Sequence, residues 1–463
     1  MTKRGVILLA GGGQDVTAEI AILNKTAVAL AADSAVTISA GSNQHKIFDS
    51  ADKLFELCEK DPIAIMINND MSFMETPLPV LIKQYRSIAP RFDNVRQAGY
   101  HFLEFLDEFA KQSPKRIKIQ SLNNILRPLI QDVNEKSRES FISKIIDENT
   151  GQLKPEYTED PDAIPGVARK SLSEELDNIS ALIDSLPDAS FIGEGDLTFS
   201  DDENRVIDDV VADILNNADD HQHKYACDIL RRAALKRYVS VSSTGIIVSG
   251  FGKDEIFPTL VSFELEGVIG NRLKFSETNF VDIDREGTRA RVLPFAQREM
   301  VERFLYGLDM PLRDQIANFC RSAVPRISEE LMQGLDMAAD DAGQLRARAA
   351  RAEQAFYQGL EEDGFQAIQS SSEAEIQDMV EFMPKAEMAR MAEALVNLTS
   401  IKRRVSRGFE TVGGPIDVAI VSRAEGFVWV SRKHYFPREL NDRYFARITR
   451  SPKEEGSDPK SVD

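Results

Sequence analysis

Short apolar runs dominate the first seventy residues of the chain. Residues 20–23 and 28–32 are apolar at nearly every position and are separated by a polar pair, and residues 53–57 and 63–67 repeat this arrangement. Short apolar runs bounded by polar residues predict β-strands, and the brief separators predict two hairpins. Because apolar and polar positions do not alternate, we expect both faces of the sheet to be covered, by a second sheet or by helices.

Polar residues stand at the ends of these runs. Thr17 opens the first strand, Asp33 ends the second, and Lys53 begins the third, so we expect all three at one edge of one sheet. A threonine hydroxyl becomes a good nucleophile when a base removes its proton, and a free α-amine on the same residue, with an ordinary pKa of about 8, can do this. A lysine nearby would keep that amine neutral, and an aspartate would hold the lysine as a cation.

The stretch from Thr17 to Asp70 resembles the start of proteasome β-type subunits, including the bacterial HslV kind. In that family an N-terminal threonine is followed sixteen positions later by an aspartate, which is the spacing of Thr17 and Asp33 here. A lysine then opens the next strand, as Lys53 does after a slightly longer loop. The family has a glycine after the fourth strand, whereas this chain has Asn68-Asn69-Asp70 in the expected turn.

The resemblance implies acyl transfer from an amide, with a site made of Thr17, Asp33, Lys53, Asn68 and Asn69. A backbone N–H at Asn68 or Asn69 would bind the oxyanion of the tetrahedral intermediate, because asparagine tolerates unusual φ angles.

The implied mechanism needs Thr17 to become the first residue. Residues 1–16 would be a leader that is removed by attack of Thr17 on its own preceding peptide bond or by another protease, and Gly11 to Gly13 would give a flexible approach to that bond. Thr2 is a competing start, since removal of Met1 would expose it, but no matching strand follows it at the right distance.

The remaining chain predicts helices and strands in an order similar to that of the family. We expect strands within residues 238–275, with turns at 252–254 and 266–267, and over residues 417–422 and 426–432. The apolar face formed by Phe102, Phe105, Leu106 and Phe109 predicts packing of one helix against the sheet. We expect helices over residues 74–86, 95–112, 122–133, 167–186, 204–216, 225–235, 298–308, 327–359 and 388–404.

A second match lies near the C-terminus, where the family has a supporting Ser-Gly-Gly preceded by an aspartate. Gly413-Gly414 match this motif, Val412 occupies the serine position, and Thr411 or Glu410 could substitute through a shifted loop. The family's aspartate has no clear equivalent.

Three blocks, about residues 17–112, 238–310 and 385–433, carry the resemblance. It implies an α+β fold, the four-layer αββα sandwich of N-terminal nucleophile (Ntn) hydrolases. We expect a leader at 1–16, a sandwich built from 17–114 and 238–450, a helical insertion at 115–237 that departs from the family, and a disordered polar tail at 451–463.

Composition narrows the possible environment. The net charge of −19 disfavours nucleic acid or an anionic membrane as a partner. Three distant cysteines indicate no disulfide or zinc framework and favour a reducing cytoplasm. The apolar runs are short, so we expect no transmembrane or signal segment. We interpret His221 and His223 as surface residues and expect no cofactor and no metal.

Two classes of function remain open at this point. One is a threonine-type hydrolase, a proteasome-like peptidase that acts on a peptide or protein as a homo-oligomer, with a separate ATPase or partner protein as a possible feeder. The alternative is a catalytically inactive sandwich that serves as a scaffold or binding module through its helical insertion. A small-molecule amidase on the same fold is a third possibility.

Overall fold

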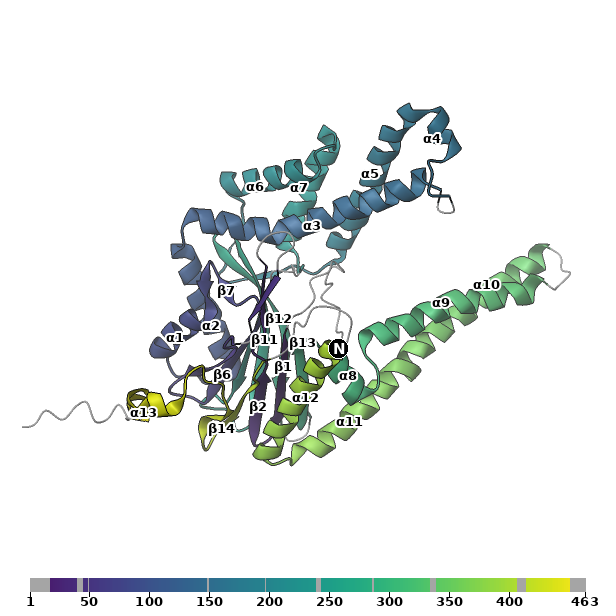
Figure 1. Cartoon of the computed structure of the whole chain (residues 1–463). Coiled ribbons are helices and arrows are strands. Elements are labelled where there is room, and N and C mark those ends of the chain that lie inside the picture. The colour runs from purple at the N-terminus through teal and green to yellow at the C-terminus, as the bar shows by residue number, and fades with distance from the viewer. Residues whose placement is uncertain are drawn as a thin grey trace, which may run out of the picture.

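Two antiparallel sheets form the centre of the protein in the computed structural model (Figure 1). The structure describes residues 17–39, 45–48, 50–147, 150–195, 197–238, 243–284, 287–333, 339–405 and 414–449. The predicted leader at 1–16, the tail at 451–463, and the expected support positions from Glu410 to Gly413 lie outside the described residues.

The first sheet has five strands in the order β13-β1-β2-β14-β15. The predicted first hairpin is confirmed, because Glu19 pairs with Ala32 and Leu23 pairs with Val28. Sequence reasoning missed the strand β13, which contains Pro294; proline is tolerated there because β13 is an edge strand. The bounds are β1 (Ala18–Asn24), β2 (Ala27–Ala32), β13 (Ala290–Ala296), β14 (Asp417–Ser422) and β15 (Gly426–Ser431).

The second sheet has six strands in the order β5-β6-β10-β11-β12-β9. Its β5–β6 hairpin confirms the second predicted hairpin. The bounds are β5 (Leu54–Cys58), β6 (Ile63–Asn69), β9 (Ser190–Phe191), β10 (Thr244–Gly250), β11 (Thr259–Ile269) and β12 (Arg272–Asp282).

One of the two predicted turns in this sheet is wrong. Residues 252–254 do lie between β10 and β11, but β11 continues through Gly267 as a bulge. The chain reverses instead at Gly270 and Asn271, whose φ angles of 56° and 58° suit the tight turn of a hairpin.

Apolar side chains from both sheets interdigitate between them, and helices cover the outer faces. The inner core includes Ala21, Leu23, Leu30, Met66, Ile247 and Leu260. On the outer face of the six-stranded sheet lie α1 (Leu78–Ile88) and α2 (Val95–Gln112), and on that of the five-stranded sheet lie α8 (Glu299–Tyr306), α11 (Ala367–Glu381) and α12 (Lys385–Val405). The expectation that both faces of the strands are covered is therefore confirmed.

The helix predicted from residue 74 begins later. Met74 and Glu75 have φ angles of 50° and 60° in the turn between the short strands β7 (Ser72–Phe73) and β8 (Thr76–Pro77), which a helix cannot contain. In α2, Phe102 and Leu106 are buried against the sheet, as its apolar periodicity predicted.

Helices fill most of residues 115–237 (Figure 1). Their apolar side chains form a core of their own. This helical insertion comprises α3 (Lys115–Ile145), α4 (Pro155–Glu159), α5 (Ile164–Ser185), α6 (Asp201–Ile214) and α7 (Asp220–Leu235). It is joined to the six-stranded sheet by β9, which pairs with Lys274 and Phe275 of β12.

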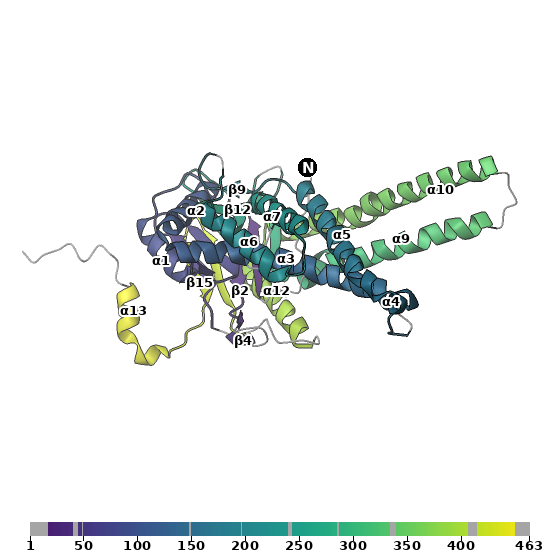
Figure 2. The same cartoon turned by 90° about the horizontal axis from the view of Figure 1, so that it is seen from above.

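A second helical projection follows α8 and extends away from the sheets (Figures 1 and 2). It consists of α9 (Met310–Gln333) and α10 (Ala339–Gly359), and the π-helix Leu360–Gln366 leads back to α11. Phe319 and Leu331 of α9 are about 70% exposed. No helix within the described ranges combines the length and apolarity needed to cross a bilayer.

Candidate active site

Thr17, Asp33 and Lys53 meet between the two sheets. The expected single sheet edge is wrong, because Thr17 and Asp33 flank the β1–β2 hairpin of the five-stranded sheet, whereas Lys53 precedes β5 of the six-stranded sheet. The Lys53 Nζ atom lies 2.5 Å from Asp33 Oδ1. The β1–β2 and β5–β6 hairpins belong to different sheets. Lys53 therefore bridges the two sheets instead of lying beside Asp33 within one sheet.

The alternation of β1 explains how Thr17 is directed inward. Ala21 and Leu23 belong to the core between the sheets, whereas Ile20 and Ile22 pack beneath the outer helices. With a side-chain period of two, Thr17 and Glu19 share the inner face. The Thr17 hydroxyl donates a hydrogen bond to Glu19 Oε2 at 3.2 Å, and Thr17 is 1% exposed.

Lys53 connects the two carboxylates of the site. Its ammonium donates to Glu19 Oε1 at 3.2 Å as well as to Asp33 Oδ1, and all three side chains are fully buried. Asp33 Oδ1 also accepts the Ala18 N–H at 3.2 Å. Two acids and one cation therefore hold the threonine hydroxyl and the peptide that follows it in a fixed arrangement.

Glu19 has an unusual protonation equilibrium. Burial raises the pKa of its carboxyl to about 7, against the lowering effect of Lys53, and the nearby Asp33 charge raises it further. A carboxyl with this pKa exchanges protons readily near neutral pH, which is the property required of a general base.

Sequence reasoning missed Glu19. The available signal was a carboxylate inside an otherwise apolar strand, two residues after Thr17 and therefore on the same face. An acid at such a position has to find a buried partner, and Lys53 is that partner.

The expected turn at Asn68-Asn69 is wrong, because β6 continues through Asn69. Ala64 and Met66 of this strand face the inner core, so Asn68 faces it too. Its Oδ1 atom is buried and has no hydrogen-bond partner among the described residues. Gly245 lies directly opposite, and a Cβ atom there would come within 1.8 Å of Asn68 Oδ1, so the glycine makes room for the amide.

The backbone N–H groups of Asn68 and Asn69 point in opposite directions. The Ile67 N–H donates to the Lys53 carbonyl at 2.9 Å, so the next N–H along β6 turns toward β10 and the one after it turns back toward Lys53. Asn69 also has a φ of 60°. Of the two expected backbone donors, only Asn69 is therefore on the Lys53 side.

A second ion pair lies next to the first. Asp417 pairs in the sheet with Ala32, the neighbour of Asp33, and accepts hydrogen bonds from the Lys433 backbone and ammonium. The same ammonium lies 3.4 Å from Asp52, the neighbour of Lys53. This pair ties together the two chain segments that carry Asp33 and Lys53, and sequence reasoning did not find it.

No protein-family model matches the chain, and no curated protein matches it either.

Proposed function

We propose that the protein is a threonine-type N-terminal nucleophile hydrolase, a proteasome-like peptidase that cleaves amide bonds once Thr17 has become the first residue. The observation that carries this proposal is the convergence of the Thr17 hydroxyl, two carboxylates and the Lys53 ammonium in one buried network. Hydroxyl, acid and base side chains gathered in this way are the components of nucleophilic catalysis on an acyl group.

The arrangement of layers supports the same class. Two stacked antiparallel sheets with helices on both outer faces are what an αββα sandwich of Ntn hydrolases requires. In such a sandwich the nucleophile opens a strand of one sheet, which is the position of Thr17 before β1.

Before the leader is removed, the Thr17 nitrogen is an amide and cannot act as a base. Glu19 Oε2 already accepts the Thr17 hydroxyl and can take its proton. The oxygen then attacks the Val16 carbonyl carbon, the C–N bond breaks, and the nitrogen receives a proton to become the α-amine. Water hydrolyses the resulting ester, which releases residues 1–16 as a free acid and regenerates the hydroxyl.

After this step the α-amine of Thr17 replaces Glu19 as the base for substrate cleavage. Its ordinary pKa of about 8 allows a neutral fraction at working pH, and the Lys53 ammonium favours that neutral form. Asp33 and Glu19 then hold Lys53 in place. The Asn68 Nδ2–H group and the Asn69 N–H are the candidate donors to the oxyanion.

A proteasome-like peptidase buries its sites in a ring, so we propose a homo-oligomer acting on peptides or unfolded proteins in the cytoplasm, where a separate ATPase could deliver substrate. The free state of the cysteines, Cys58, Cys227 and Cys320, is compatible with a reducing compartment.

One observation favours the alternative of an inactive sandwich that binds a partner through its helical insertion. A hollow of about 700 Å³ lies between α3, α5 and the end of α6, lined by both polar and apolar side chains such as Ser137, Phe141, Arg169 and Leu172. Such a volume suits a small ligand or a partner side chain.

The intact mass of the purified full chain separates these functions. The hydrolase should lose residues 1–16 and start at Thr17, and Thr17→Ala should keep the leader and should not react with a threonine-directed electrophile. Thr2→Ala is the matched control and should mature normally. Retention of the leader by the wild type, or undiminished peptide hydrolysis by Thr17→Ala, would refute the enzyme and leave the binding module.

A further inference from the structure

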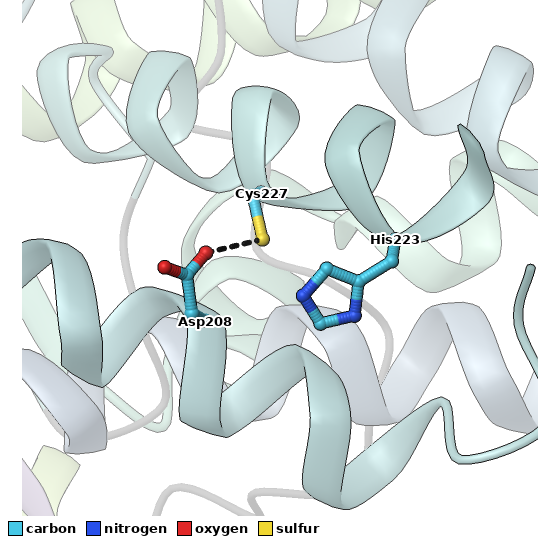
Figure 3. A group of neighbouring side chains, drawn as sticks. All are labelled: Asp208, His223 and Cys227. Atoms are coloured by element: carbon cyan, nitrogen blue, oxygen red, sulfur yellow. Dashed lines mark hydrogen bonds between the residues drawn. The ribbon is translucent and has the colours of Figure 1, made fainter. Parts of the chain in front are cut away.

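Three metal-binding side chains meet in the helical insertion, on the two helices α6 and α7 (Figure 3). His223 and Cys227 are four residues apart on α7, so they share one face of that helix. Asp208 faces them from α6, and the ligand atoms of all three residues lie within 4.8 Å of one another.

We propose that Asp208, His223 and Cys227 form a zinc site that joins α6 to α7. One thiolate, one imidazole and one carboxylate are the ligand types that Zn²⁺ takes, whereas Mg²⁺ and Ca²⁺ prefer oxygen ligands alone. This proposal differs from the expectation that His221 and His223 are surface residues without a metal. The sequence places the two histidines together, but it does not show that His223 faces Cys227 and Asp208.

The geometry needs little adjustment to accept the ion. Ligand atoms around a tetrahedral zinc lie roughly 3 to 4 Å apart, since each is about 2.0 to 2.3 Å from the metal. Cys227 Sγ and Asp208 Oδ1 are already 3.1 Å apart. Only the imidazole of His223, which is half-buried and points at the other two in Figure 3, has to close in.

The exposed side chain of Asp208 gives a metal ion access to the three ligands from the surface. Cys227 is 2% exposed and forms the inner end of the group, whereas Asp208 is exposed at the outer end. An ion can therefore enter from the surface and keep a water molecule in the fourth position. A zinc ion with one neutral and two anionic ligands carries no net charge, which suits a site at the rim of an apolar core.

The hydrogen-bond pattern argues against a nucleophilic cysteine here. In the usual cysteine nucleophile a histidine accepts the thiol proton, but the Cys227 thiol donates to Asp208. Zinc would replace that proton, so the sulfur becomes a ligand as the proton leaves to solvent.

Arg231 is the neighbouring cation that competes for Asp208. Its Nη2 atom lies 3.9 Å from Asp208 Oδ1, a weak contact, and its Nε–H already donates to Asn204 at 3.0 Å. The Arg231 guanidinium can therefore keep its hydrogen bond to Asn204 when the Asp208 carboxylate turns to the metal.

The test uses the untagged full chain, stripped of metal with a chelator and titrated with zinc chloride by calorimetry. We expect one zinc per chain, a higher melting temperature with zinc, and a thiolate-to-metal charge-transfer band when Co²⁺ replaces zinc. Cys227→Ser, His223→Gln and Asp208→Asn should each weaken zinc binding at least tenfold, and Cys227→Ser should remove the charge-transfer band.

His221→Gln and Cys320→Ser are the matched controls and should bind zinc like the wild type. Asp208 is exposed, so Asp208→Asn should stay folded, and circular dichroism checks this for each variant. The absence of zinc binding to the wild type overturns the proposal. So does unchanged binding in Cys227→Ser, or a loss in His221→Gln as large as that in His223→Gln, which would indicate a surface histidine pair instead.

Discussion

Lys53 reaches from the six-stranded sheet to Asp33 of the five-stranded sheet, with 2.5 Å between Nζ and Oδ1. Both side chains are excluded from solvent. A fully buried ion pair is costly to break, because removing one partner leaves the other charge buried without compensation. The bond between these two residues therefore links the stability of the two packed sheets to the geometry of the proposed active site.

Lys53→Met should destabilise the fold and stop maturation. Loss of the ammonium leaves Asp33 and Glu19 buried together, so we expect the free energy of unfolding to fall by about 3 to 5 kcal/mol, measured by chemical denaturation. The exposed Lys83→Met on α1 should change it by less than about 0.5 kcal/mol.

The combined variant Glu19→Gln/Asp33→Asn/Lys53→Met tests whether uncompensated buried charge causes the lost stability. It carries no buried charge at these positions, so it should recover part of the lost stability while the leader stays attached. No recovery of stability would show that the unpaired carboxylates do not cause the loss in Lys53→Met, and leader removal by the combined variant would refute Glu19 as the base.

Glu19→Gln should change how stability depends on pH. The folded-state pKa of about 7 lies above the ordinary 4.5, so the folded protein binds the proton more tightly. Glu19 therefore makes its full contribution to the free energy of unfolding below about pH 4.5. This contribution is lost as the pH rises through 7, a change on the order of 3 kcal/mol.

Denaturation curves at several pH values between 4.5 and 7.5 measure this slope. The wild type should lose stability across the window more steeply than Glu19→Gln does. Glu104→Gln, on the exposed side of α2, should follow the wild type. Parallel slopes for Glu19→Gln and the wild type would show that the Glu19 proton is not held more tightly in the folded state.

The rate of leader removal should rise with pH and level off above about 7. Only the ionised Glu19 can take the proton of the Thr17 hydroxyl, and burial raises its pKa to about 7. In Glu19→Gln the rate should fall by roughly 10² to 10⁴-fold and lose this rise. Mass spectrometry of freshly refolded protein follows the reaction; maturation of Glu19→Gln at the wild-type rate would assign the base to another group.

Gly245→Ala should disturb the site through Asn68. The new Cβ atom would lie 1.8 Å from Asn68 Oδ1 and 2.7 Å from its Cγ, so the amide has to turn away. If the amide stabilises the oxyanion, Gly245→Ala and Asn68→Ala should each lower kcat for a fluorogenic peptide mixture by about 10² to 10³-fold.

The double variant Gly245→Ala/Asn68→Ala tests whether both changes act on the same side chain. Removal of the amide vacates the space that the new methyl group needs, so the double variant should be no slower than Asn68→Ala alone. Gly343→Ala, in open space on α10, is the control and should leave kcat unchanged. Additive losses in the double variant would mean that Gly245 acts independently of Asn68.

The sequence by itself determined the local elements. The β1–β2 hairpin and the spacing between Thr17 and Asp33 follow from short apolar runs and a brief turn, because neighbouring residues set the register of a hairpin. The bounds of α2 follow in the same way from an apolar stripe with a period of 3.6. These features depend on residues close together in the chain, which pattern and propensity describe well.

Only the tertiary structure decided which residues meet across larger separations. Packing brought Lys53, which precedes the six-stranded sheet, to Asp33 of the other layer and made Glu19 the second partner of Lys53. It also set Asn68 against Gly245. It likewise brought Asp208 of α6 to Cys227 of α7. Such contacts arise from the burial of whole faces, where the shape and charge of distant elements have to fit at once, and local patterns carry no information on that fit.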